Sequence, residues 1–334
     1  MDGPAKPLGI DVALVQSGFT PQDYRSADAF GSRVAALVEL ALSGRRRPSL
    51  VAFPELTGMW LPLLCDGIPR SVAALAALSV LRHPLRAASS LIRGRGLSFV
   101  FSRDWKRHFH AWIEPFREAA SRHAVYVCPG STFLPRIDRD STRDWELHDE
   151  RIWNTSCLLG PRGRILALTR KVYPMPDELR LGVRPGRPEE LQVARTDIGR
   201  IGILICLDGF YESLVSRIDT AGAEIVIQPS ANPVPWKAAL RDGRWVPPGE
   251  GRAGEVTQEE QWLSLGIGSL IQGRESVRAS LNPMSVSRIL GHNDEGQSSI
   301  FRNASGRSRE SGAYPGLLAR AEPWDRETVL RARI

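Results

Sequence analysis

Three apolar segments of the sequence each lead into a residue that can take part in acid–base or nucleophilic chemistry. The run SLVAF leads into Glu55, RILALTR into Lys171, and RIGILI into Cys206. Because ligands of open α/β sheets gather outside the carboxyl ends of strands, three residues far apart in the sequence can face one pocket. A carboxylate, an ammonium and a thiol in that pocket would supply a base, a cation for a developing oxyanion, and a nucleophile.

Cys206 alone is a weak indication of function, because a cysteine that ends an apolar strand is usually a small buried hydrophobic residue. The residues that follow it favour a functional interpretation. Leu207-Asp208-Gly209 predicts a sharp turn into a helix that begins near Phe210. The N-terminus of such a helix would favour a thiolate, and its free N–H groups could hold an oxyanion.

Glu55 and Lys171 also have ordinary interpretations. A glutamate after a proline at a strand end can be a solvated loop carboxylate or an acidic residue at a helix start. Lys171 can be a surface cation, but of the 44 lysines and arginines in this chain only four are lysines. A lysine beside Arg170 in such a background indicates a site that requires a compact ammonium rather than a planar guanidinium.

Short runs of Val, Ile and Leu alternate with longer amphipathic segments, which predicts a layered α/β fold. The predicted strands are Ile10–Gln16, Ser49–Phe53, Ala124–Cys128, Ile152–Leu159, Arg164–Thr169, Arg200–Cys206, Glu224–Gln228, Met284–Ile289 and Gln297–Phe301. The predicted helices are Ala27–Ser43, Arg70–Arg93, Trp105–His123, Phe210–Ala221 and Gln258–Ser276.

Turn-forming residues set the connections between these elements. PRG at 161–163, between two apolar runs, predicts a hairpin and therefore mixed sheets. The charge-rich segment 135–150 and the Gly- and Pro-rich segment 241–257 are predicted to be loops. No repeat or composition shift marks a boundary, so we expect one domain over residues 1–334.

Length and composition exclude several classes of protein. A chain of 334 residues with 42% apolar residues can build a substantial core, which excludes disorder as its main state. No apolar stretch approaches the roughly 20 residues of a membrane-spanning helix, and the first residues lack the pattern of a secretion signal. We therefore expect a cytoplasmic protein without a transmembrane segment.

The charged and metal-binding side chains give no sign of a nucleic-acid or metal partner. The net charge is +7, but the arginines are spread along the chain and mixed with 37 acidic residues, so we expect no nucleic-acid binding. The four cysteines show no CxxC spacing and are interpreted as free thiols. His108 and His110 point to different faces of a predicted helix and are interpreted as surface residues rather than metal ligands.

Three motifs resemble, in order, the signatures of the nitrilase, or carbon-nitrogen hydrolase, superfamily. They are FPEL at 53–56, RKVYP at 170–174 with Glu178 shortly after it, and ICLDGFYESL at 205–214. The segments DVALVQ, NTSCLLGPRGRILALTRK, AGAEIVIQPSANPVPW and GQSSIF also resemble elements of that family, so the likeness covers most of residues 8–305.

The resemblance implies a four-layer α-β-β-α fold with mixed sheets and a catalytic triad. It assigns Cys206 as the nucleophile, Glu55 as the general base and acid, and Lys171 as the cation that stabilises the oxyanion. Glu178 matches a second glutamate that supports the triad, and the backbone N–H of Leu207 would share the oxyanion. This chemistry proceeds through a thioester, and it needs no metal or organic cofactor.

Departures from the family pattern narrow the expected substrate. Leu207-Asp208 follows the nucleophile where the nitrilases tend to have Trp-Glu, which favours hydrolysis of a small-molecule amide or N-carbamoyl compound, with nitrile hydrolysis as an alternative. The segment RESVRASLNP after the last predicted helix departs from the usual Arg-Ala-x-Glu-Asn stretch. A non-catalytic binding or scaffolding protein that keeps the fold is the second hypothesis.

Two further segments extend the expected domain. The stretch at about 60–107 is interpreted as a helical insertion that packs on the core, with a lid over an apolar substrate or a peripheral membrane contact as alternatives. A C-terminal extension is expected after about residue 305. From the resemblance alone, we expect a homodimer or a larger homo-oligomer.

Overall fold

The computed structural model describes residues 8–64, 98–139, 145–242, 244–250, 252, 254–304 and 314–334. The helix expected at Arg70–Arg93 lies outside the described residues. Among those that are described, no helix is long and apolar enough to cross a bilayer.

The first sheet combines strands from both ends of the chain. Its members are β1 (Asp11–Gln16), β2 (Leu50–Ala52), β3 (Tyr126–Cys128), β4 (Ser131–Arg139), β5 (Trp145–Leu159), β6 (Ile165–Arg170) and β17 (Thr328–Arg333). The order is β17-β1-β2-β3-β5-β4, and β6 also pairs with β5. β1, β2 and β3 are parallel, whereas β17, β4, β5 and β6 are joined by antiparallel pairs, so the predicted mixed pairing is confirmed.

The second sheet is also mixed. Its members, in spatial order, are β16 (Leu317–Arg320), β15 (Ser299–Arg302), β12 (Ala279–Asn282), β9 (Ile225–Ile227), β8 (Gly199–Ile203) and β7 (Val193–Thr196). β12, β9 and β8 are parallel, β15 and β7 run antiparallel to them, and β16 pairs antiparallel with β15.

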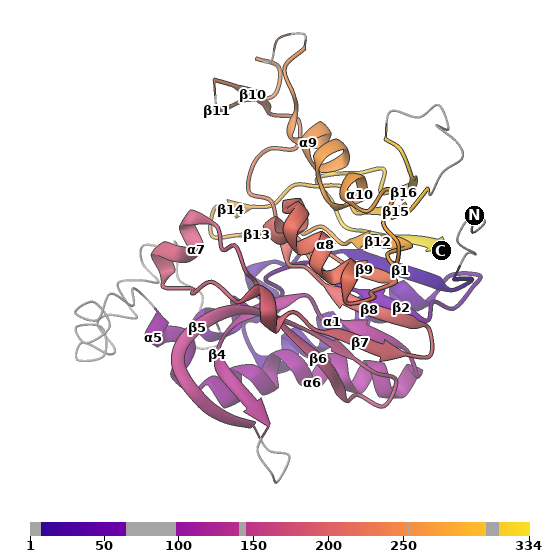
Figure 1. Ribbon diagram of the computed structural model, residues 1–334. Helices are drawn as coiled ribbons and strands as arrows, with labels where there is room; N and C mark the ends of the chain where they lie inside the picture. The colour runs from indigo at the N-terminus through magenta and orange to yellow at the C-terminus, as the bar shows by residue number, and fades with distance from the viewer. Residues whose placement is uncertain are drawn as a thin grey trace.

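Helices cover the outer face of each sheet. The helices on the first sheet are α1 (Ala27–Leu42) and α6 (Trp105–His123), and those on the second are α8 (Glu212–Thr220), α9 (Gln258–Leu265) and α10 (Ile267–Leu270). Figure 1 shows α1 and α6 on one side of the molecule and α8, α9 and α10 on the other, with the strands between them. The layers are therefore α-β-β-α, as the resemblance implied.

Three apolar cores hold these layers together. Leu14 and Ala52 from the first sheet pack with Ile203 and Ile227 from the second, and all four are fully buried or nearly so. A second core joins α1 and α6 to the first sheet, and a third joins α8, α9 and α10 to the second sheet. Because successive strand residues point to opposite faces, one strand can serve an inner and an outer core.

Several short elements complete the described chain. The remaining helical segments are η1 (Pro21–Tyr24), α2 (Leu61–Leu64), α5 (Ser98–Ser102), α7 (Pro176–Leu181), η2 (Pro188–Glu190) and η3 (Cys206–Phe210). Two small hairpins are β10 (Ala239–Arg241) with β11 (Arg244–Val246) and β13 (Arg288–Ile289) with β14 (His292–Asn293). The β10–β11 hairpin projects from the body of the molecule (Figure 1).

Three sequence predictions were wrong in part. Segment 135–150 was expected to be a loop, but β4 and β5 run into it from both sides and pair there, because Ile137 and Trp145 turn inward and join the core between the first sheet and helices α1 and α6. Segment 241–257, also expected to be a loop, contains β11. The helix expected over Gln258–Ser276 breaks at Gly266, where α9 ends and α10 begins.

The strand expected at Met284–Ile289 was also wrong. The strand of the second sheet is β12, five residues earlier. In the expected segment, Met284 forms an isolated bridge with Ser230, and the last two residues pair as β13. Ser285 and Ser287 instead form side-chain hydrogen bonds with each other (3.0 Å), and Ser285 donates to Asp294 (2.7 Å). These local hydrogen bonds offer the backbone an alternative to the sheet ladder.

The described ends of the two extra segments pack onto the sheets. On the edges of the 60–107 stretch, Phe101 of α5 packs edge-on against Phe133 of β4, with ring centroids 5.1 Å apart. After residue 313, β16 and β17 each form the outermost strand of one sheet. Residues 314–334 are therefore part of both sheets.

Candidate active site

The structure brings Glu55, Lys171 and Cys206 together at neighbouring strand ends. Glu55 follows β2 by three residues, Lys171 directly follows β6, and Cys206 follows β8 by three residues. The exposed fractions of the three residues are only 4%, 1% and 5%. The expectation that the carboxyl ends of separate strands would share one site is therefore met for these three side chains.

Lys171 lies between two carboxylates. Its Nζ atom is 2.7 Å from Oε1 of Glu55 and 2.7 Å from Oε2 of Glu178. Glu178 lies in the first turn of α7, where its Oε2 also accepts a hydrogen bond from the backbone N–H of Met175 (2.7 Å). The chain thus turns back after Pro174, so that the Glu178 carboxylate in α7 lies beside Lys171, the residue before this loop.

Asn154 completes this buried cluster, and sequence analysis missed it. Its Nδ2 donates to Oε1 of Glu55 (2.8 Å) and to Oε1 of Glu178 (2.7 Å). Asn154 lies on β5 and is fully buried. A polar residue at an inward-facing position of a strand was the available signal, because buried polar groups need partners. We refer to Glu55, Asn154, Lys171 and Glu178 as the lysine cluster.

The backbone at Cys206 has an unusual conformation. Its φ angle is +51°, a left-handed conformation that costs a non-glycine residue of order 1–3 kcal/mol. Two contacts hold it: the N–H of Cys206 donates to the Pro229 carbonyl (2.9 Å), and Nε2 of Gln228 donates to the Cys206 carbonyl (2.7 Å). The turn directs the sulfur toward Ala231, whose carbonyl oxygen accepts from the thiol at 3.6 Å.

Glu55 has the properties of a base that works near neutral pH. Burial raises the pKa of its carboxyl to about 7, against the opposing charge of Lys171, while the nearby Glu178 raises it further. Hydrogen bonds from Lys171 and with Cys206 act in the opposite direction. Two carboxylates share one ammonium, so the second carboxylate gains little compensation for its lost hydration. Oε2 of Glu55 also accepts from the N–H of Ala231 (3.2 Å).

Cys206 is a thiol at rest rather than a thiolate. Burial raises its pKa well above the ordinary value, the charge of Glu55 raises it further, and Lys171 lowers it. The expected helix near Phe210 begins only at Glu212, because the five-residue 3₁₀ turn η3 comes first. The electrostatic help of a long helix N-terminus is therefore missing, so a reaction at this sulfur would require a base to remove the thiol proton.

Lys171 remains charged in this environment. Burial acts to lower its pKa, but the charges of Glu55 and Glu178 outweigh burial and raise the pKa well above the ordinary value. The site thus combines a fixed cation, a carboxyl that titrates near neutrality, and a protonated sulfur.

The other residues named by sequence analysis lie elsewhere. In the described part of the chain, no three His, Cys, Asp or Glu side chains come together as a group that could hold a metal ion. Cys128 and Cys157 are free and buried in the fold, and burial raises the pKa of both thiols.

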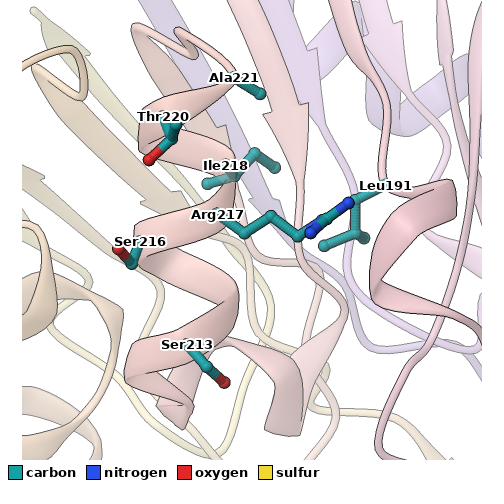
Figure 2. Close-up of a pocket in the computed structure, with 7 residues that line it drawn as sticks. All are labelled: Leu191, Ser213, Ser216, Arg217, Ile218, Thr220 and Ala221. Carbon is teal, nitrogen blue, oxygen red and sulfur yellow. The ribbon is translucent and has the colours of Figure 1, made fainter.

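A surface groove on the far side of α8 is separate from this cluster. Figure 2 shows Leu191 and Arg217 on facing elements, with Ser213, Ser216 and Thr220 along the helix. The groove has a volume of about 480 Å³, and none of its lining residues belongs to the lysine cluster.

The sequence matches the profile of the Carbon-nitrogen hydrolase family over residues 11–254. The chain belongs to the carbon-nitrogen hydrolase family. The matched residues contain the lysine cluster and Cys206, so the cluster lies inside the part of the chain that carries the family pattern.

Curated relatives of this carbon-nitrogen hydrolase include amidases. Deaminated glutathione amidase from Mus musculus is 32% identical over 112 residues, which are 30% of this chain and 34% of the mouse protein. The protein of that name from Yersinia enterocolitica is 29% identical over 124 residues, 34% of this chain and 40% of its own length. The matched region spans about a third of the length of these relatives.

Solved structures of two bacterial proteins share the fold of this carbon-nitrogen hydrolase. A carbon-nitrogen hydrolase from Helicobacter pylori G27 has a TM-score of 0.62 at 18% identity, covering 97% of this chain and 88% of that one. The amidase from Nesterenkonia sp. AN1, in a mutant that shows Michael addition of acrylamide at its active-site cysteine, has a TM-score of 0.58 at 14% identity. That match covers 97% of this chain and 93% of the amidase.

Proposed function

We propose that this carbon-nitrogen hydrolase is an amidase that cleaves a linear amide or N-carbamoyl compound through a thioester on Cys206. The observation that carries the proposal is that Glu55, the carboxyl that titrates near neutral pH, accepts hydrogen bonds from Lys171 and from the N–H of Ala231, the residue whose carbonyl accepts from the Cys206 thiol. Base, cation and nucleophile are thus linked in one buried group. The name of the curated relatives, deaminated glutathione amidase, favours amides over nitriles as substrates.

The first half of the reaction forms the thioester. Glu55 removes the proton of the Cys206 thiol as the sulfur bonds to the amide carbon, and the electron pair of the carbonyl moves onto its oxygen. Lys171 and the backbone N–H of Leu207 stabilise that oxyanion. Leu207 lies in the first turn of η3, where N–H groups precede the intrahelical hydrogen bonds. The carbonyl then reforms, the C–N bond breaks, and Glu55 returns its proton to the departing nitrogen.

The second half releases the acid. A water molecule loses a proton to Glu55 and attacks the thioester carbon, and a second oxyanion forms at the same position. When the C–S bond breaks, the sulfur leaves as a thiolate and recovers the proton from Glu55. The net reaction consumes one amide and one water and yields one carboxylic acid and one amine or ammonia.

Glu178 and Asn154 position the reacting groups in this scheme. Asn154 donates to Glu178, and Glu178 accepts from Lys171, the cation that also bonds Glu55. Both residues are buried. Because Asn154 holds one oxygen of each glutamate, the proton carried by Glu55 moves between fixed atoms rather than between rotating side chains.

The proposal is tested with purified protein and a panel of linear amides, N-carbamoyl amino acids and nitriles, with release of ammonia or amine as the readout. We expect turnover of at least one amide or carbamoyl compound, and loss of at least about 10⁴-fold in Cys206→Ala. Cys157→Ala is the matched control, because Cys157 is a buried free thiol outside the cluster. Full turnover in Cys206→Ala, or turnover of nitriles alone, would overturn the proposal.

A further inference from the structure

A buried carboxylate ties the segment that carries Lys171 to the segment that carries Cys206. Asp208, two residues after Cys206, is fully buried. Its Oδ2 accepts from the backbone N–H of Val172 at 2.9 Å, and its Oδ1 accepts from the N–H of Tyr173 at 2.8 Å. Both donors immediately follow Lys171, so one side chain spans the gap between two catalytic segments.

A ring contact joins the same two segments. Tyr173 stacks on Tyr211 with ring centroids 3.8 Å apart and planes 26° from parallel. Tyr211 closes the η3 turn, and its own N–H donates to the backbone carbonyl of Asp208 at 3.2 Å. The Lys171 segment is therefore held against the η3 turn by a carboxylate on one side and an aromatic stack on the other.

The remaining backbone contacts of Lys171 lead away from Cys206. Its N–H donates to the Asn154 carbonyl of β5 (2.9 Å), and its carbonyl accepts from the N–H of Gly186 (2.7 Å). These bonds fix Lys171 relative to the first sheet. Cys206 lies in η3, after β8 of the second sheet, so local contacts between η3 and the Lys171 segment set the distance between ammonium and sulfur within the packed sheets.

We propose that Asp208 is the positioning residue that sets this distance, and that it does so only when ionised. A carboxylate offers an acceptor oxygen to each of the two N–H groups, whereas a protonated carboxyl presents an O–H to one of them. Loss of one bond then leaves a buried N–H without its partner and releases the Lys171 segment. This inference rests on the proposed function for the roles of Lys171 and Cys206.

Burial places the titration of Asp208 just below neutral pH. Burial raises the pKa of Asp208 to about 6, the hydrogen bonds from Val172 and Tyr173 and the charge of Lys171 lower it, and Glu178 raises it. The carboxylate is thus ionised at neutral pH, and the link weakens as the pH falls through about 6.

Asp219 provides a matched control for mutagenesis. It is also buried, at 9% exposure, and its Oδ1 accepts from two consecutive backbone N–H groups, those of Ser276 (2.8 Å) and Val277 (2.9 Å). These bonds join α8 to the segment before β12 and contact no residue of the lysine cluster. Asp208→Ala and Asp219→Ala therefore remove the same type of interaction, one inside and one outside the site.

The test compares both variants with the wild type in thermal midpoint, in turnover, and in the pH dependence of Cys206 alkylation by iodoacetamide. We expect similar losses of thermal midpoint in the two variants. In Asp208→Ala alone, kcat falls about 10- to 100-fold with little change in KM, and the alkylation midpoint moves to higher pH because the Lys171 charge is displaced from the sulfur. Unchanged kcat and alkylation in a folded Asp208→Ala would overturn the inference.

Two further measurements decide the case if Asp208→Ala does not fold. Asp208→Asn, which keeps one acceptor oxygen, is expected to show the same changes to a smaller extent. In the wild type, hydrogen exchange at Val172 and Tyr173, normalised to Ser276 and Val277, is expected to accelerate as the pH falls through about 6. A ratio that stays constant from pH 5 to 7.5 would refute the link. The alkylation and exchange measurements need no substrate. They therefore test the role of Asp208 independently of whether the protein has the proposed amidase activity.

Discussion

At the scale of single residues, the main feature of the site is that two buried carboxylates share a single positive charge. One ammonium, that of Lys171, serves two buried carboxylates and faces a buried thiol. Removing one member of a buried ion pair leaves an uncompensated charge, which typically costs 3–5 kcal/mol. The same shortage makes Glu55 a stronger base than an exposed glutamate, because its proton is held more tightly.

The titration of Glu55 predicts the pH profile of the enzyme. Only ionised Glu55 can accept the thiol proton, so kcat/KM should fall as the pH drops through about 7, the pKa that burial gives this carboxyl. Below pH 7, kcat/KM should fall by about one decade per pH unit. Below pH 6 the fall should be steeper, because Asp208 also becomes protonated there. Initial rates at low substrate concentration from pH 5 to 9 check this. An acidic limb centred below pH 5 would contradict the assignment of Glu55 as the base.

Removal of the cation predicts a loss of stability that depends on pH. Lys171→Met keeps the length of the side chain but leaves Glu55 and Glu178 buried together, so we expect a loss of about 3–5 kcal/mol at pH 8. The pKa of Glu55, which burial already raises, then loses the opposing effect of the Lys171 charge and lies further above that of the unfolded chain. Stability of the variant is therefore highest below the unfolded pKa, and it falls as the pH rises through the folded pKa, so the difference from wild type is smaller at pH 5.

Denaturant unfolding at both pH values measures this effect, with Lys237→Met as the control. Lys237 pairs with Glu259 at the surface, where its side chain is 41% exposed, and its removal should cost no more than about 1 kcal/mol at either pH. Equal losses for the two lysine variants, or a loss at Lys171 that does not change with pH, would show that the carboxylates do not depend on this cation.

At the scale of elements, the site is built from strand ends and the turns after them. β2, β6 and β8 each lead into one of the three side chains proposed to react, and α7 brings Glu178 to the lysine. Gly186 lies against this arrangement: a Cβ atom there would be 2.7 Å from the Arg170 carbonyl oxygen and 3.0 Å from that of Lys171. The close approach of the two backbone segments thus requires a glycine at this position.

This contact predicts a loss of activity from a residue outside the cluster. Gly186→Ala should displace the Lys171 backbone, lower stability by about 1–3 kcal/mol and reduce kcat about 10-fold or more. Gly163→Ala is the matched control, since its Cβ would lie 2.8 Å from the Arg117 carbonyl oxygen, at the opposite end of the β5–β6 hairpin. We expect it to lose stability and keep kcat per folded molecule. Kinetic and unfolding measurements on both variants check this. Unchanged kcat in Gly186→Ala together with reduced kcat in Gly163→Ala would contradict a positioning role for the contact between Gly186 and Lys171.

Local patterns in the sequence predicted these strand ends. The same patterns did not predict the roles of residues whose contacts are distant in the sequence. The apolar runs before Glu55, Lys171 and Cys206 and the hairpin at 161–163 follow from periodicity and turn chemistry alone. Asn154 lies on a predicted strand, but its role depends on two glutamates that are 99 and 24 residues away in the sequence. Asp208 was visible as part of a turn, yet its two donors lie in the loop after β6 of the other sheet, more than 30 residues away in the sequence.

At the scale of the whole molecule, the last described strands hold the two sheets at their edges. β17 pairs with β1 along six residues, and β16 pairs with β15. Leu330 of β17 packs against the core between the sheets, beside Leu14. The residues at the end of the chain therefore support the same layer that positions Glu55 on β2.

A truncation tests this support. Removal of residues 328–334 exposes the edge of β1 and eliminates a ladder of six residue pairs, so stability should fall by about 3 kcal/mol or more. An unpaired edge strand also favours association between copies of the chain. We expect a lower thermal midpoint together with larger species in size-exclusion chromatography. A truncated protein with an unchanged midpoint and elution volume would show that β17 is dispensable.

The covalent intermediate is the most direct test of the central claim that Cys206 attacks the substrate carbon with the help of Glu55 and Lys171. The measurement is intact-mass and peptide mass spectrometry on protein that is acid-quenched during turnover of an amide. We predict an added acyl group, the mass of the amide less that of its amine, on the peptide that contains Cys206, and its disappearance once substrate is consumed. Turnover without any adduct in rapidly quenched samples, or an adduct on Cys128 or Cys157 instead, would contradict the account.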